Sequence, residues 1–150
     1  ISGCGSFKSE KVVGKDIRSE DITEFYYTDT ATTNPPRFQR YHFHTEDGKY
    51  LFTHEKREGD KVFLTEEDIT VTGTLELTEE EWAELYGLLC DGKVTKRSDN
   101  NNLNDGGSRY LFLYWKGDKD DYQVFSFAPD RLYAFEQLCL ELKDREMKKN

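Results

Sequence analysis

Two histidines separated by a single residue form the pattern best suited to metal chemistry. His42 and His44 lie in a run of alternating side chains, so on a strand both would point to the same side of the sheet. Imidazole is a common ligand of zinc and other transition metals. A site needs a third ligand, but the register predicted below sends His54 to the opposite face and places Glu55 only on a diagonal. The alternative interpretation is a solvent-facing strand surface shared with Arg40.

An acidic, asparagine-rich loop at residues 99–107 is a second candidate cation site. The calcium loop of an EF hand places oxygen ligands at alternate positions before a glycine at its sixth position. If Gly106 is the sixth residue, Leu103 becomes the third; if Gly107 is the sixth, Gly106 becomes the fifth. Neither register supplies the ligands, so we expect no EF-hand site, while a cation site of another kind stays open.

Side chains suited to catalysis do not form a recognisable group. The sequence has no Gly-x-Ser-x-Gly motif, which positions the nucleophile of many hydrolases. No pair of carboxylates stands out among the 30 acidic residues. Cys90 and Cys139 fall on predicted helices as small buried hydrophobic residues, and a disulfide between the two helices is the alternative. We therefore predict no catalytic residue, no enzyme activity and no cofactor.

The first residues, Ile1-Ser2-Gly3-Cys4, carry a pattern typical of lipid attachment. They resemble the lipobox of bacterial lipoproteins, and the chain as a whole resembles small uncharacterised members of that class. The resemblance implies cleavage of a signal peptide before Cys4 and a diacylglycerol on its thiol, and two acyl chains are what stable anchoring needs. It therefore implies a domain held on the extracytoplasmic face of a bacterial cell membrane. The alternative is a cysteine present by chance in the N-terminal segment.

Composition and charge set limits on the partners and on the domain organisation. The formal net charge is −9 and no basic stripe is visible, which excludes the electrostatic basis of nucleic-acid binding. Residues 1–21 are mostly polar and are predicted to be the lipobox remnant followed by a flexible tether. Residues 22–150 are predicted to form a single domain, because 150 residues fit one hydrophobic core.

A β-hairpin formed by residues 37–45 and 50–56 is the clearest structural signal. Asp47-Gly48 between two alternating runs is typical of a two-residue turn, which fixes the register. The predicted cross-strand pairs share one face, which we expect to be core: Thr45 with Tyr50, Phe43 with Phe52, and Tyr41 with His54. The opposite face carries Arg40, His42, His44, Leu51, Thr53 and Glu55.

Further strands and two helices complete the predicted fold. Thr78 and Glu81 form a capping-box pattern that starts one helix, which Asp91-Gly92 ends, and residues 130–146 form the second. The predicted strands outside the first hairpin cover residues 22–28, 69–77, 109–116 and 122–127, and residues 61–64 are a candidate for a further short strand. The sequence thus predicts an α+β fold, with an antiparallel sheet of about five to six strands and both helices on one face.

The aromatic content leaves room for a ligand surface. Most aromatic residues at alternate strand positions are expected to pack in the core or against aromatic residues of the neighbouring strand. The residues that form the alternative, a platform for a peptide or glycan, are Tyr26, Tyr27, Tyr110, Tyr114, Trp115 and Tyr122. We predict a non-enzymatic module that binds a protein, peptide or glycan. The alternatives are an envelope accessory or inhibitor protein and, third, a metal-dependent protein using His42 and His44.

Overall fold

The computed structural model describes residues 10–61, 63–96, 107–116 and 123–149. Its eight strands form one sheet in the order β1-β6-β8-β7-β2-β3-β4-β5, and all of these strand pairs are antiparallel. The strands are β1 (Lys11–Val12), β2 (Ile22–Ala31), β3 (Arg37–Glu46), β4 (Lys49–Arg57), β5 (Ile69–Leu77), β6 (Lys93–Lys96), β7 (Gly107–Trp115) and β8 (Gln123–Ser126). The helices are α1 (Glu79–Leu89) and α2 (Leu132–Lys148), and 3-10 turns lie at Ser19–Asp21 and Glu66–Asp68.

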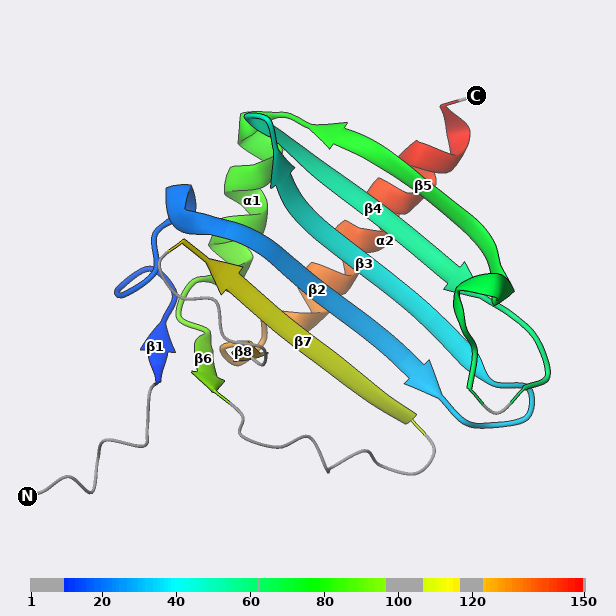
Figure 1. Ribbon diagram of the computed structural model, residues 1–150. Helices are drawn as coiled ribbons and strands as arrows, with labels where there is room; N and C mark the ends of the chain where they lie inside the picture. The colour runs from blue at the N-terminus through cyan, green and yellow to red at the C-terminus, as the bar shows by residue number, and fades with distance from the viewer. Residues whose placement is uncertain (1–9, 62, 97–106, 117–122, 150) are drawn as a thin grey trace, which may run out of the picture.

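The α+β class is confirmed, and both helices lie behind the same face of the sheet (Figure 1). The strand count differs from the expected five to six because β1 and β6 are too short to show an alternating pattern. The candidate strand at residues 61–64 is absent from the described part of that range, and Phe63 there is exposed.

The hairpin of β3 and β4 has the predicted turn and register. Asp47 and Gly48 both adopt positive φ, at 53° and 78°, as a two-residue turn that follows the strand twist requires. Thr45 pairs with Tyr50, Phe43 with Phe52 and Tyr41 with His54. The last four of these residues are buried, so the assignment of this face to the core is confirmed.

The two helices cover the core face with the predicted apolar stripes. The Thr78 hydroxyl accepts a hydrogen bond from the Glu81 amide while the Glu81 carboxylate accepts one from the Thr78 amide, so the capping box is formed. Helix α2 begins at Leu132, two residues later than expected, because Asp130 has a φ of 68°, which a right-handed helix excludes. The buried residues of the two helices are Trp82, Leu85 and Leu89 in α1, and Phe135, Leu138, Cys139 and Leu142 in α2.

The chain joins the fold earlier than the tether predicted for residues 1–21. β1 pairs with β6, and Val13 and Ile17 are both 1% exposed within the hydrophobic core. A tight turn explains how two sparse apolar residues reach the core together: Gly14, with a φ of 98°, donates its N–H to the Ile17 carbonyl. Residues 11–17 are therefore part of the domain.

Candidate functional site

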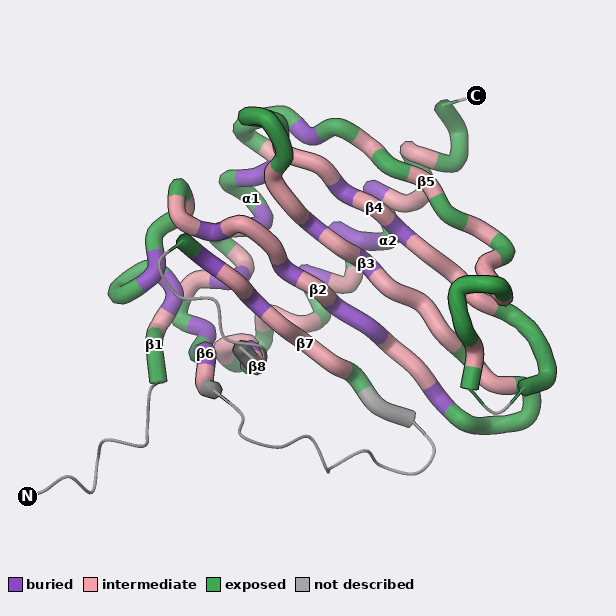
Figure 2. The backbone as a smooth tube through the Cα atoms, viewed as in Figure 1, coloured by how far each residue is buried: buried purple, intermediate pink, exposed green. Residues whose placement is uncertain are grey.

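The two faces of the sheet differ in what covers them. Figure 2 shows buried residues interspersed with half-buried ones along β2, β3 and β4, as expected when one face packs on helices and the other does not. Among the described elements, both helices lie on the same side, so the opposite face of β7, β2 and β3 has no helix over it (Figure 1). We call this surface the open face.

A groove of about 490 Å³ runs over the open face with β2 at its centre. Its residues are cross-strand neighbours: Thr28, for example, is paired with Arg40 on β3 and with Tyr110 on β7. The groove follows β2 from Glu24 to Thr30, which is about 20 Å at the ordinary rise of a strand. The complete lining is Glu24, Tyr26, Thr28, Thr30, Phe38, Arg40, Tyr110, Phe112 and Tyr114.

A stack of three rings borders one end of this groove. The Tyr26 and His42 rings are parallel within 7° with centroids 4.1 Å apart, and His42 stacks on His44 at 4.2 Å. Glu24 Oε1 holds the stack in place, because it accepts a hydrogen bond from the Tyr26 hydroxyl at 2.7 Å and lies 3.0 Å from His42 Nε2. Burial and this bond raise the pKa of Tyr26, which therefore remains a hydrogen-bond donor at neutral pH.

His42 and His44 lie on one face as predicted, but as stacked rings and not as two ligands around a common point. Burial and then the neighbouring His44 lower the pKa of His42 to about 4, so its ring is neutral at pH 7. His44 Nε2 lies 3.4 Å from the Thr53 hydroxyl. His54 is on the opposite face, as predicted, and the described residues contain no group of three or more His, Cys, Asp and Glu side chains placed to hold a metal ion.

Arg40 is the cation of the groove. Its Nε donates a 3.0 Å hydrogen bond to the Thr28 hydroxyl, and its guanidinium lies over the rings of Phe38 and Tyr26, with Cζ 5.1 and 6.0 Å from their centroids. An aromatic ring attracts a cation placed over its face, so these contacts help to hold the guanidinium in the groove. Burial lowers the pKa of Arg40 from its ordinary value, and the group remains charged at neutral pH.

The aromatic residues predicted as a possible ligand platform do not all lie on one surface. Tyr26, Tyr110 and Tyr114 line the groove, whereas Tyr27 and Trp115 are buried in the core, and Tyr122 lies outside the described residues. Phe38, Phe112 and Arg40 also line the groove but were not among the residues predicted for a platform. The exposed side of Arg40 was predictable, because the hairpin register places Arg40 on the face opposite the core.

The remaining candidate residues do not contribute to this site. Cys90 and Cys139 are free thiols. Cys139 is buried as predicted, which raises its pKa well above the ordinary value, whereas Cys90 is only half-buried because it lies just after the end of α1. Cys4 and the loop at 99–106 lie outside the described residues.

Neither a membrane-spanning helix among the described residues nor similarity to a known protein indicates the role of the open face. No helix in the described part of the chain combines the length and apolar character needed to cross a membrane. No family model, curated protein or solved structure matches this chain.

Proposed function

We propose that this chain is a non-enzymatic binding module, anchored through a lipid on Cys4 to the extracytoplasmic face of a bacterial membrane, and that its open face holds an extended peptide segment. The observation that carries the binding proposal is the groove of about 490 Å³ walled by aromatic rings. This volume falls in the ordinary range of ligand sites, which is about 300–1,000 Å³.

The shape of the groove favours a chain-like ligand. It follows one strand for about 20 Å, and an extended peptide of about six residues has the same length. Tyr110 and Phe112 on β7 and Phe38 on β3 stand on either side of β2, so the groove is only a few strands wide. A long, narrow groove with aromatic walls suits side chains arranged along an extended backbone.

The chemistry of the lining favours a peptide over a glycan. Sugar hydroxyls need many polar partners, but several polar side chains of the groove already bond within the protein. The Tyr26 hydroxyl donates to Glu24, the Thr30 hydroxyl donates to the Arg37 carbonyl, and the Thr28 hydroxyl accepts from Arg40. What the groove offers a ligand is mainly aromatic surface, which rewards apolar side chains.

Selection from a displayed library of random seven-residue peptides tests the binding proposal. We expect wild-type protein to enrich peptides rich in apolar residues, and Tyr110→Ala to weaken a selected synthetic peptide by about tenfold or more, as the loss of a tyrosine contact at an interface does. The measurement is titration calorimetry. Tyr133→Ala is the matched control, since Tyr133 is an exposed tyrosine on α2 and should leave affinity unchanged. Enrichment on a glycan array with no enriched peptide would contradict the proposal.

Membrane anchoring has a separate test. We expect Cys4→Ser, expressed from the gene with its upstream codons, to move the protein from the membrane fraction to the soluble fraction, because the substitution removes the thiol that would carry the lipid. Its thermal unfolding should equal that of the unlipidated wild-type domain. Cys90→Ser is the control and should stay in the membrane fraction. A Cys4→Ser protein that remains in the membrane fraction would contradict the anchor.

A further inference from the structure

The charge of the groove points to the chemistry of its ligand. We infer that the peptide held on the open face carries a carboxylate, from an Asp or Glu side chain or a C-terminus, that pairs with the guanidinium of Arg40. This inference rests on the proposed peptide-binding function and specifies the ligand for the same groove.

Arg40 differs from the other arginines that the structure describes. Each of the other described arginines makes an ion pair with a carboxylate, and these pairs are Arg18–Glu20, Arg37–Asp29, Arg57–Glu55, Arg109–Glu136, Arg131–Asp91 and Arg145–Glu81. Arg40 makes no such pair within the described part of the chain, although the protein has an excess of nine negative charges. Burial lowers the pKa of Arg40 and its cross-strand neighbour Glu55 acts to raise it, but the Glu55 carboxylate forms its ion pair with Arg57. Among the described residues, the half-buried guanidinium of Arg40 is therefore left without a carboxylate at ion-pair distance, which burial disfavours.

The guanidinium is also positioned to receive a ligand. Its Nε is committed to the Thr28 hydroxyl, while neither Nη atom donates to an acceptor among the described residues. Two N–H groups on the remaining edge match the two oxygens of a carboxylate in a bidentate pair. Phe38 and Tyr26 lie beside the group, with ring centroids 5.1 and 6.0 Å from Cζ, and help to hold it in the groove.

The carboxylate at the other end of the groove does not offset this charge. Glu24 lies four residues along β2 from Thr28, which is about 13 Å at the ordinary strand rise. It already has the Tyr26 hydroxyl and His42 as hydrogen-bond partners. The charge left without a partner in the groove is therefore positive, and it complements an anionic group of the ligand.

The test compares wild type, Arg40→Gln and Arg40→Lys against the displayed heptapeptide library and against synthetic peptides taken from it. We expect wild type to enrich peptides with an acidic residue or a free C-terminal carboxylate beside apolar residues. Neutralising that carboxylate as the amide should weaken binding to wild type by about tenfold or more, the range for a hydrogen bond to a charged group. The same neutralisation should change binding to Arg40→Gln by less than about twofold, because the partner is gone.

Arg40→Lys separates charge from geometry. A lysine retains the positive charge but not the two parallel N–H donors, so we expect it to recover only part of the preference for the acidic peptide. Enriched peptides without a carboxylate, or an equal loss on neutralisation in wild type and Arg40→Gln, would overturn the inference while leaving peptide binding in place. Failure of wild type to enrich any peptide would overturn both. Equal melting temperatures of the three proteins establish that a change in affinity arises in the groove.

Discussion

Phe135→Ala is expected to destabilise the domain by about 3–5 kcal/mol, the ordinary cost of removing a large aromatic side chain from a core. Phe135 of α2 is fully buried, and its ring packs against aromatic rings of the sheet. Its ring lies 5.4 Å from the ring of Phe25, 5.5 Å from Tyr27 and 5.8 Å from Phe43, measured between centroids. Neighbours held on two paired strands cannot move enough to close the cavity that alanine would leave.

Chemical denaturation measures this effect against a control on the same helix. Tyr133 is 71% exposed, so Tyr133→Ala should change the free energy of unfolding by less than about 0.5 kcal/mol. The two variants remove aromatic rings two positions apart, so helix propensity alone would affect them similarly. Equal destabilisation by the two substitutions would show that α2 does not pack on the sheet through Phe135.

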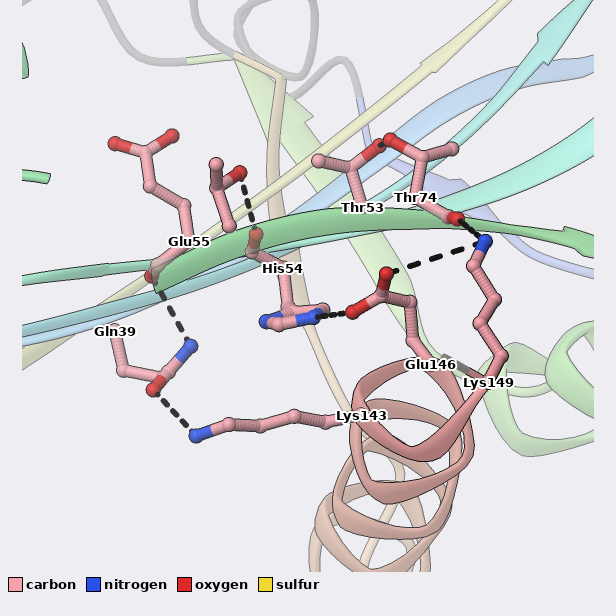
Figure 3. A network of polar contacts seen from close by, with 9 residues as sticks. Gln39, Thr53, His54, Glu55, Thr74, Lys143, Glu146 and Lys149 are labelled. Atoms are coloured by element: carbon pink, nitrogen blue, oxygen red, sulfur yellow. Dashed lines mark hydrogen bonds and ion pairs between the residues drawn. The ribbon is translucent and has the colours of Figure 1, made fainter. Parts of the chain in front are cut away.

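Glu146→Ala is expected to cost about 2–3 kcal/mol, because it leaves a buried imidazole without its carboxylate hydrogen-bond partner. Figure 3 shows the Glu146 carboxylate, from the last turns of α2, directed at His54 in the middle of β4. The His54 side chain is fully buried, and its Nε2 lies 2.6 Å from Glu146 Oε1. Its Nδ1 has no hydrogen-bond partner among the described residues. Within that part of the chain, Glu146 is therefore the polar partner of the imidazole ring.

Gly73 is the reason that the carboxylate can reach this histidine. It is the residue of β5 paired with His54, and a Cβ at this position would lie 2.2 Å from the carboxylate of Glu146. Glutamine at 146 retains an acceptor for His54, so Glu146→Gln should lose clearly less stability than Glu146→Ala. Glu141→Ala, at an exposed position of the same helix, is the control and should be near neutral. A Glu146→Ala loss no larger than that of Glu141→Ala, measured by denaturation, would contradict a structural role for the pair.

Local signals explain which parts of the fold were predictable. The Asp47-Gly48 turn fixed the register of β3 and β4, and therefore the faces of Tyr41, Phe43 and His54. The Thr78 cap likewise fixed the start of α1. The pairing of His54 with Glu146 spans 92 residues, and no local rule assigns a partner at that distance.

The candidate site was predictable in its residue types but not in its arrangement. Tyr110, Phe112 and Tyr114 share one face of β7, whereas Leu111 and Leu113 share the other. Both faces are apolar, so alternation alone does not reveal which one packs on the helices. The short strands β1 and β6 were missed for a related reason, since two to four residues show no period.

Amide chemical shifts during titration of the labelled domain with a selected acidic heptapeptide locate the binding surface residue by residue. A ligand on the open face should shift amides of β2, β3 and β7 around Thr28, Arg40 and Phe112, and leave the exposed side of α2 around Tyr133 unchanged. Shifts confined to the helices or to the β4–β5 edge, with β2 unaffected, would contradict the account.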